Sequence, residues 1–426
     1  MSKAYLEVYG CSSNLADFEI ASGLLKQAGF EMVNAEEFDL VVIFTCVVKQ
    51  PTFNKMVHRI RELSKFGKPL IVAGCMTKTD ASLIEKINPR ASLLSPDNIE
   101  KIVEVANAAM KGERIVLTGD LKKPKLGFPR CRKNPLVAIV QIARGCTSNC
   151  SYCYEPYRGK LFSYPPKEIV KEVKRALNDG CKEIWLTSLD CGCYGLDIGT
   201  NLAELLREIC KIEGKFFVRV GMANPLHVKK ILGKLIKVYQ DERIFKFLHL
   251  PLQSGSDRIL KLMKRGYNTK DFLEIVEKFR KAFPQLTLST DIIVGFPGET
   301  EEDFSATVKI LREVKPDVVN LSKFGARKGT EASRMKQLEP KILNERSLKL
   351  SKIIKEISLE KNKSWVGWRG EALVDEIGKK ESFVARNFAY KPIVLKTREK
   401  IFGKFVEVEV EEARENFLIT KIQSLI

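Results

Sequence analysis

Three cysteines lie close together in the segment RGCTSNCSYC, where Cys146, Cys150 and Cys153 have the spacing C-x3-C-x2-C. A closed structural zinc site takes four ligands, whereas a four-iron cluster held by three thiolates leaves one iron open for another molecule. The spacing therefore predicts a [4Fe–4S] cluster whose open iron binds a substrate or cofactor. Three structural cysteines in a turn are the alternative interpretation.

A second set of cysteines follows apolar runs near the N-terminus. Cys11, Cys46 and Cys75 come directly after the runs AYLEVYG, LVVIFT and PLIVAG. Ligand sites in open parallel sheets lie beyond the carboxyl ends of the strands, so we expect these three thiols to converge. Nearby helix N-termini would favour the thiolate form. Buried cysteines that only end their strands are the alternative.

The elements that position these cysteines alternate between strand and helix. Over residues 1–115, short apolar runs alternate with amphipathic stretches, which predicts an open parallel α/β sheet domain. Residues 116–131 are rich in Lys, Gly and Pro, which is typical of a linker. A second alternation over residues 132–361 predicts a partial β/α barrel, whose chemistry belongs at the C-terminal ends of its strands. Cys146 comes just past such an end.

Residues 362–426 contain short alternating strands separated by Gly or charged turns. This pattern predicts a small all-β barrel of OB-like type, a frequent RNA-binding module. Aromatic residues in this segment lie among many basic ones, and we favour core packing over base stacking for most of them. They are Trp365, Trp368, Phe383, Phe388 and Tyr390.

The overall charge favours a polyanionic partner. The 426 residues include 72 Lys and Arg against 53 Asp and Glu, which gives a formal net charge of +19. Nucleic acid is the partner that this excess favours, although an ion-paired thermophilic surface would also be rich in Lys and Glu. We find no membrane-spanning apolar run and no signal peptide, so we expect a cytoplasmic protein. There, eleven cysteines favour metal or redox chemistry over disulfides.

Ordered words along almost the whole chain resemble the radical S-adenosylmethionine (radical SAM) methylthiotransferase family. They include YGCSSNLADFEI, VAGCM, RGCTSNCSYC, HLPLQSGSDRILKLMKRGY and TDIIVGFPGETEEDF. The C-terminal segment resembles the family's RNA-binding TRAM domain. The words RKNPL, RGKLFSYP, EIWLTS and VRVGMANP resemble the archaeal and eukaryotic branch, which acts on N6-threonylcarbamoyladenosine at position 37 of tRNA.

The resemblance implies a tRNA-modifying enzyme that adds a methylthio group at C2 of this adenine. Cys146, Cys150 and Cys153 would hold the cluster that cleaves S-adenosylmethionine to a 5′-deoxyadenosyl radical, because an unactivated aromatic C–H bond requires radical chemistry. An auxiliary [4Fe–4S] cluster on Cys11, Cys46 and Cys75 would carry the sulfur. No catalytic residues beyond these ligands are implied. The expected partners are the tRNA anticodon loop and a low-potential electron donor of ferredoxin or flavodoxin type.

Five residues are carried over as S-adenosylmethionine contacts by their positions in the family words. They are Ser188, Asp190, Gln253, Asp291 and Gly295. Each could instead cap a helix or form a turn. Glu299 could simply start the helix that follows.

The chain departs from the branch pattern beside one of these contacts. Leu189 stands where the branch has an acid, which puts a polar contact to the cofactor's amino group in doubt. Cys191 and Cys193 could be sulfur ligands or a redox pair, but small residues in a tight loop are the interpretation that we favour. The remaining cysteines, Cys131, Cys181 and Cys210, are assigned to packing or the linker.

Alternative functions stay open from the sequence. A methylthiotransferase of the same family could act on isopentenyladenosine in tRNA or on an aspartate of a ribosomal protein. A non-catalytic iron–sulfur RNA-binding protein, or a zinc-binding RNA chaperone, would retain the cysteines and the basic charge without radical chemistry.

Overall fold

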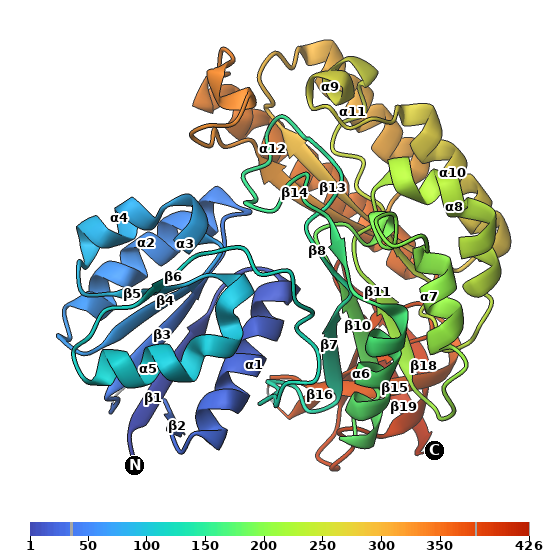
Figure 1. The fold of residues 1–426 in the computed structure, drawn as a ribbon. Helices are drawn as coiled ribbons and strands as arrows, with labels where there is room; N and C mark the ends of the chain where they lie inside the picture. The colour runs from blue at the N-terminus through green and yellow to red at the C-terminus, as the bar shows by residue number, and fades with distance from the viewer. Residues whose placement is uncertain (35–36, 380, 426) are drawn as a thin grey trace. The chain divides into compact units, whose positions relative to one another are not determined.

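The computed structural model describes residues 1–34, 37–379 and 381–425 of the chain (Figure 1). The chain forms two compact units, and the cysteine-rich loop passes from one to the other. The first unit comprises Met1–Lys133, Ile139–Cys146 and Cys153–Tyr164, and the second comprises Asn134–Ala138, Thr147–Tyr152 and Pro165–Ile426.

The first unit is built on a six-stranded sheet in the order β2-β1-β3-β4-β5-β6, and every pairing in it is parallel. Helices α1 and α5 cover one face, and α2, α3 and α4 cover the other (Figure 1). The predicted open parallel sheet is confirmed, and β6 lies at the start of the predicted linker. The elements are β1 (Lys3–Val8), α1 (Ser12–Gln27), β2 (Glu31–Val33), β3 (Leu40–Thr45), α2 (Gln50–Ser64), β4 (Leu70–Gly74), α3 (Met76–Thr79), α4 (Ala81–Ile87), β5 (Ser92–Leu94), η1 (Pro96–Lys101), α5 (Ile102–Met110) and β6 (Val116–Leu117). Strands β8 (Ala143–Arg144) and β9 (Phe162–Ser163) form an antiparallel pair in the same unit.

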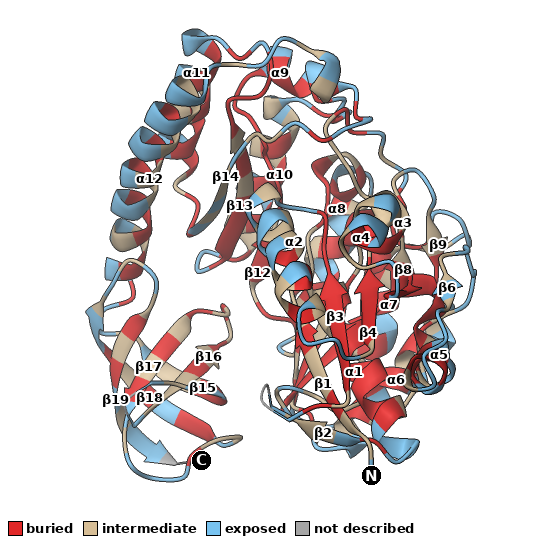
Figure 2. Ribbon diagram, turned by 90° about the vertical axis from the view of Figure 1, so that its left-hand side faces the viewer, coloured by how far each residue is buried: buried red, intermediate tan, exposed pale blue. Residues whose placement is uncertain are grey.

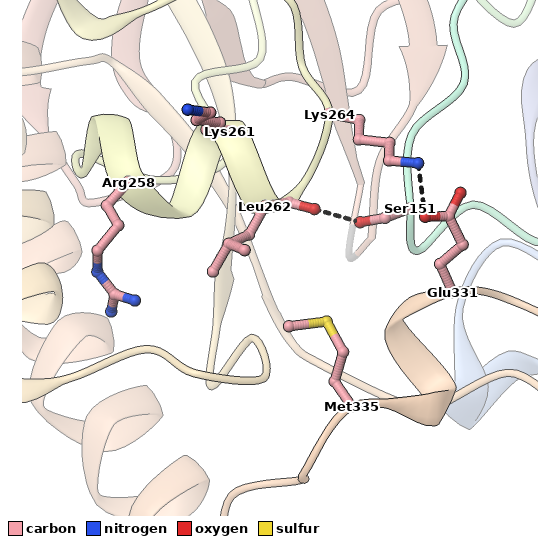
Figure 3. Close-up of a pocket in the computed structure, with 7 residues that line it drawn as sticks. All are labelled: Ser151, Arg258, Lys261, Leu262, Lys264, Glu331 and Met335. Atoms are coloured by element: carbon pink, nitrogen blue, oxygen red, sulfur yellow. Dashed lines mark hydrogen bonds and ion pairs between the residues drawn. The ribbon is translucent and has the colours of Figure 1, made fainter.

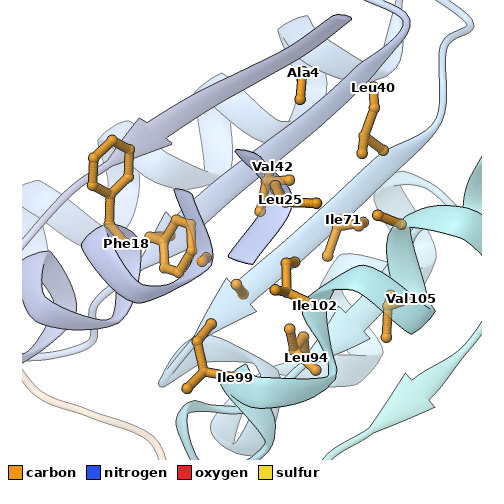
Figure 4. Close-up of a cluster of buried hydrophobic side chains, with 14 of the residues drawn as sticks. Ala4, Phe18, Leu25, Leu40, Val42, Ile71, Leu94, Ile99, Ile102 and Val105 are labelled. Atoms are coloured by element: carbon orange, nitrogen blue, oxygen red, sulfur yellow. The ribbon is translucent and has the colours of Figure 1, made fainter. Parts of the chain in front are cut away.

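Strand β3 lies at the centre of this unit because its sequence LVVIFT is apolar on both faces, as a covered parallel strand requires. Val42 and Phe44 pack with α1 and α5 in one fully buried cluster (Figure 4). Val41 and Ile43 point to the opposite face and join a second cluster with α2 and α4. The sheet therefore holds its central strands between two apolar layers.

The second unit contains the strands and helices of a partial β/α barrel. Its strands belong to two groups, β11-β10-β7 and β12-β13-β14, although Ile139–Gln141 of β7 are assigned to the first unit. Strand β10 pairs with β11, and β13 pairs with β12 and β14, all in parallel, and Val218 bridges to Ile244 where the groups meet. The predicted partial barrel is confirmed. The elements are β7 (Val137–Gln141), α6 (Pro166–Asn178), β10 (Glu183–Thr187), η2 (Cys191–Cys193), α7 (Leu202–Ile209), β11 (Phe217–Val220), α8 (Pro225–Val238), β12 (Phe247–His249), α9 (Asp257–Leu262), α10 (Thr269–Ala282), β13 (Thr287–Val294), α11 (Glu301–Val314), β14 (Val318–Lys323), η3 (Ala332–Arg334) and α12 (Pro340–Lys363).

Five further strands close into a small barrel in the order β15-β16-β17-β19-β18, as predicted. Helix α12 leads into it and shows a buried stripe along one side and an exposed one along the other (Figure 2). Trp365 is buried in the barrel core, and Trp368, Phe383 and Phe388 pack against that core, in keeping with the packing role favoured from the sequence. The strands are β15 (Arg369–Ile377), β16 (Ser382–Asn387), β17 (Pro392–Lys396), β18 (Phe405–Ala413) and β19 (Leu418–Leu425).

Within the described residues, no helix combines the length and the apolar character needed to cross a membrane.

Candidate functional site

The first three cysteines lie at one edge of the six-stranded sheet, because the strand register aligns the ends that carry them. Val8 pairs with Phe44 and Thr45 pairs with Gly74, so Cys46 and Cys75 follow neighbouring strand ends. The backbone N–H of Cys75 donates to the carbonyl of Thr45 at 3.1 Å. Cys11 ends the loop after β1 and precedes α1.

Two glycines permit this close approach. Gly10 has φ +104°, and a Cβ placed on it would lie 2.2 Å from Cβ and 2.7 Å from Sγ of Cys46. Gly74 has φ +96°, and a Cβ there would lie 2.3 Å from the carbonyl oxygen of Thr45. Only glycine combines these backbone angles with the missing Cβ.

The thiols of this group interact with one another. Cys11 donates its S–H to the sulfur of Cys46, which raises the pKa of Cys11 well above its usual value and lowers that of Cys46. Burial, followed by the charge of Glu155 and by Cys11, raises the pKa of Cys75. The start of helix α1 does favour the thiolate of Cys11, because the backbone N–H groups of Ser13 and Asn14 lower its pKa, but the hydrogen bond to Cys46 outweighs them. For Cys75, burial is the largest effect on the pKa.

Gly10→Ala should disrupt this group. The added methyl must displace Cys46 in a backbone conformation that costs about 1–3 kcal/mol for residues other than glycine. We expect a lower melting temperature and loss of about half of the iron that the reconstituted chain binds. Gly112→Ala is the matched control, because Gly112 has φ +82° but no neighbouring atom within 4 Å of the position that a Cβ would take. Full iron retention in Gly10→Ala would contradict the assignment.

The loop with the second set of cysteines begins at a further constrained glycine. Gly145 has φ +75°, and a Cβ on it would lie 2.1 Å from the carbonyl oxygen of Lys160. Cys146 and Cys150 are buried, and Cys153 is half-buried. The backbone at the start of the loop that carries these three thiols is therefore closely packed.

Arg265 contacts the middle cysteine of this loop inside the second unit. Its Nη1 lies 3.0 Å from Sγ of Cys150 and 3.3 Å from the hydroxyl oxygen of Tyr152, and its Nε donates to the hydroxyl of Tyr267 at 3.2 Å. The side chain is only 6% exposed, and its Nη2 is buried without a hydrogen-bond partner. A permanent positive charge is therefore fixed beside Cys150.

Asp190 is buried in a polar network that includes the same loop. Its Oδ1 accepts from the backbone N–H groups of Gly192 at 2.9 Å and Asn224 at 3.0 Å. His227 Nε2 lies 3.6 Å from Asp190 Oδ2 and 3.0 Å from the hydroxyl of Thr147. Burial raises the pKa of Asp190 and lowers that of His227. Asp190 Oδ2 has no hydrogen-bond partner, so it can accept a donor from a ligand.

The neighbouring residues shape the turn that holds Asp190. The hydroxyl of Ser188 accepts from the backbone N–H of Asp190 at 3.1 Å. Cys191 and Cys193 are buried, and Cys193 donates its S–H to the carbonyl of Asp190 at 3.2 Å. Burial raises the pKa of Cys191 to about 11. These contacts favour a packing role for both cysteines.

Gln253, in the segment after β12, and Asp291, in the middle of β13, form a second polar group. Gln253 has φ 68°, and its backbone N–H donates to the carbonyl of Asp291 at 2.7 Å. Its side-chain Oε1 is buried without a hydrogen-bond partner. Asp291 Oδ2 lies 3.0 Å from His249 Nε2, and its Oδ1 accepts from Asn320 Nδ2 at 2.9 Å. This arrangement orients the Asp291 carboxylate from two sides.

Gly295 sits in a turn that Glu299 closes. Its backbone N–H donates to Glu299 Oε2 at 2.8 Å, and the same carboxylate accepts from Arg346 Nη1 at 2.7 Å. A Cβ on Gly295 would lie 2.3 Å from Cγ of Leu343, so the position needs glycine. Glu299 precedes helix α11, whose N-cap is Thr300. Its carboxylate connects the Gly295 turn with helix α12, because it accepts hydrogen bonds from both Gly295 and Arg346.

The end of the cysteine loop and the first cysteine group belong to the same unit. Tyr154, next to Cys153, packs against the apolar cluster that Cys75 also contacts. Its hydroxyl donates to Asp80 Oδ1 at 3.3 Å, just beyond helix α3, which starts after Cys75. The charge of Glu155 helps to raise the pKa of Cys75. It also acts to raise the pKa of Cys46, but there the hydrogen bond from Cys11 outweighs it. Cys153, which precedes Tyr154 and Glu155 in the chain, therefore lies in the same unit as Cys11, Cys46 and Cys75.

The donor sets fit iron–sulfur clusters better than single ions. Among the described residues, no three His, Cys, Asp or Glu side chains surround one point closely enough to hold one ion. A four-iron cluster takes one thiolate per iron, so its ligands need not meet at a point. Beside the second set, Nη2 of Arg265 is buried without a hydrogen-bond partner and could meet a further polar ligand.

Sequence reasoning missed the partners that orient these residues. Arg265 lies in the word KRGY and Asn224 in GMANP, but no local pattern shows which side chains they meet. The same holds for His227, His249 and Asn320. The only signal that the sequence offers for these residues is a polar residue type in the middle of the chain, which does not identify its partner.

Three family models match the chain. Residues 3–95 match "Uncharacterized protein family UPF0004", residues 140–311 match the Radical SAM superfamily and residues 363–422 match the TRAM domain. Together they span most of the first sheet, most of the partial barrel and most of the small β-barrel.

Full-length relatives carry a consistent name. The chain is 45% identical to a Pyrococcus abyssi protein named "Probable threonylcarbamoyladenosine tRNA methylthiotransferase", with 100% of each chain covered. It is 35% identical to the threonylcarbamoyladenosine tRNA methylthiotransferase of Homo sapiens, over 98% of this chain and 73% of that protein.

Solved structures share the fold at low sequence identity. The radical S-adenosylmethionine methyltransferase TsrM from Kitasatospora setae, solved with tryptophan and an S-adenosylmethionine analogue, aligns with a TM-score of 0.54. The identity is 16%, and the alignment covers 76% of this chain and 73% of that one. The likeness shows a shared fold over the aligned part of the two chains.

Proposed function

The chain belongs to the threonylcarbamoyladenosine tRNA methylthiotransferase family, and we propose that it adds a methylthio group at C2 of N6-threonylcarbamoyladenosine at position 37 of tRNA. The observation that carries the proposal is the presence of two separate three-cysteine sets, one at the sheet edge and one in the radical SAM segment. A non-catalytic RNA-binding protein would retain the cysteines for metal alone, but it would not need a segment that matches the Radical SAM superfamily.

We assign one [4Fe–4S] cluster to each set. Cys146, Cys150 and Cys153 would hold the first, and Cys11, Cys46 and Cys75 the second. When bound, the clusters and S-adenosylmethionine supply the electron, the organic radical and the sulfur that an aromatic C–H bond requires. The residues of the chain would position the clusters and S-adenosylmethionine and exclude water from them. The hydrogen bond between Cys11 and Cys46 would keep these two thiols together until metal binds.

The polar interior of the second unit is the proposed S-adenosylmethionine site. Asp190 Oδ2 and Gln253 Oε1 are buried acceptors without hydrogen-bond partners, and an ammonium group would satisfy such acceptors. Ser188 holds the Asp190 turn, Gly295 allows close backbone approach, and Asp291 is oriented by His249 and Asn320. Asp190 could thus supply the carboxylate that Leu189 does not.

The proposed macromolecular substrate is tRNA. The net charge of +19 attracts a polyanion, and the C-terminal barrel matches the TRAM domain. A splayed base in the anticodon loop would expose C2 in the way that single-stranded RNA is usually read. We place this activity in the cytoplasm, with a ferredoxin or flavodoxin as the electron donor.

The test uses anaerobically reconstituted protein with S-adenosylmethionine, a reductant and three tRNAs that differ only at position 37. We expect 2-methylthio product by nucleoside mass spectrometry from threonylcarbamoyladenosine tRNA, and essentially none from isopentenyladenosine or unmodified adenosine tRNA. Preferred reaction with the isopentenyladenosine tRNA would overturn the substrate assignment.

Arg265→Met should make the cluster harder to reduce. The change removes a positive charge and an N–H donor beside Cys150, and hydrogen bonds to the sulfurs help to set cluster potentials. We expect the ratio of reduced to oxidised cluster at fixed ambient potential to fall about tenfold, which corresponds to ~59 mV for one electron. Potentiometric titration followed by electron paramagnetic resonance measures this ratio. Arg280→Met is the control, since Arg280 donates to backbone carbonyls instead, at Lys315 for example.

A further inference from the structure

A surface hollow in the second unit adjoins the cysteine loop directly (Figure 3). It has a volume of about 600 Å³, and one of its walls is Ser151, the residue after Cys150. Ser151 is fixed in place: its hydroxyl donates to the carbonyl of Leu262 at 2.8 Å, and its carbonyl accepts from the backbone N–H of Ala332 at 3.0 Å. The hollow and the loop therefore form one rigid local structure.

The lining combines an apolar centre with a basic rim. Leu262 and Met335 point toward each other, although Leu262 is 36% exposed (Figure 3). Arg258, Lys261 and Lys264 line the hollow with Glu331, and two of these three positive charges are paired, Arg258 with Asp303 and Lys264 with Glu331. Such a pairing of apolar centre and charged rim is typical of protein docking surfaces.

Lys261 differs from the other two basic rim residues in its lack of an ion pair with another described residue. Lys264 pairs with Glu331 at 2.6 Å, and Arg258 pairs with Asp303 in an ion pair and donates to the carbonyl of Gly298. Lys261 is exposed and forms no ion pair with any other residue that the structure describes. Its charge is free to attract an acidic partner.

The hollow has two short connections to a proposed cluster ligand. Ser151 is bonded to Cys150 through one peptide link, and Arg265, the residue after Lys264, contacts Cys150 Sγ at 3.0 Å. An electron entering at this surface would pass residues that are bonded to Cys150 or in contact with it.

We propose that this hollow docks a small acidic electron-transfer protein, an inference that rests on the proposed cluster at Cys146, Cys150 and Cys153. The donor's flavin or iron centre loses one electron, and the cluster gains that electron, with no proton or atom transferred. The apolar centre excludes water at the contact, and the basic rim orients the acidic face of the donor.

Lys261→Glu tests the proposal with reduced flavodoxin, an acidic flavoprotein, as the probe. We expect cluster reduction by flavodoxin at low salt to slow about tenfold, because charge reversal removes electrostatic steering. Reduction by dithionite should not change. Lys237→Glu, which alters an exposed lysine on α8, should leave both rates unchanged.

Each other outcome overturns the docking assignment in a distinct way. An unchanged flavodoxin rate would exclude the hollow as the docking site. Weaker tRNA binding by Lys261→Glu with an unchanged flavodoxin rate would assign the hollow to RNA. Absence of a dithionite-reducible cluster in the unaltered chain would instead refute the proposed function on which the inference rests.

Discussion

Cys150→Ala should abolish cleavage of S-adenosylmethionine. Loss of one of three thiolates removes the protein ligand of one iron, and the methyl group of alanine cannot replace it. We expect release of 5′-deoxyadenosine to fall on the order of a thousandfold, since the cofactor carries the chemistry. The measurement is product release by chromatography under anaerobic reduction.

Cys210→Ala is the matched control for this variant. Cys210 ends helix α7, and burial raises the pKa of its thiol to about 12, as expected of a packing cysteine. It should retain cluster and activity. Appreciable 5′-deoxyadenosine from Cys150→Ala, beyond that of protein without iron, would show that the loop does not hold the reactive cluster.

The combined variant Cys11→Ala, Cys46→Ala and Cys75→Ala should separate the two halves of the reaction. Iron and acid-labile sulfide should each fall from about eight to about four per chain. Release of 5′-deoxyadenosine should continue, because Cys146, Cys150 and Cys153 remain, whereas methylthio product should be undetectable. Iron analysis combined with nucleoside mass spectrometry gives both readouts.

The control for the triple variant is Cys131→Ala, which removes a thiol from the same unit outside the sheet edge. It should keep full iron and full product. Equal iron in the triple variant and the unaltered chain would exclude the auxiliary cluster at the sheet edge. Methylthio product from the triple variant would show that the sulfur comes from elsewhere.

The sequence predicted the first sheet and its cysteine edge because local patterns determine both. The run LVVIFT is typical of a strand covered on both faces, and parallel pairing aligns Thr45 with Gly74. Cys46 and Cys75 follow those two residues directly. Strand order and strand ends were therefore sufficient to bring these thiols together.

The contacts that orient the second site could not be predicted in this way. Arg265 meets Cys150 across 115 positions of sequence, and His227 meets Thr147 across 80. Such contacts depend on how helices pack around the barrel, which residue types alone do not specify. The protonation state of Cys11 could not be predicted from the sequence either, because it depends on a hydrogen bond to the sulfur of Cys46.

The most direct test of the central claim uses tRNA with deuterium at C2 of N6-threonylcarbamoyladenosine 37. After reaction with the reconstituted chain and S-adenosylmethionine, we expect mass spectrometry to find a nucleoside that has gained a methylthio group and lost the deuterium. A methylthio nucleoside that retains the deuterium, or the absence of any methylthio product, would contradict transfer to C2.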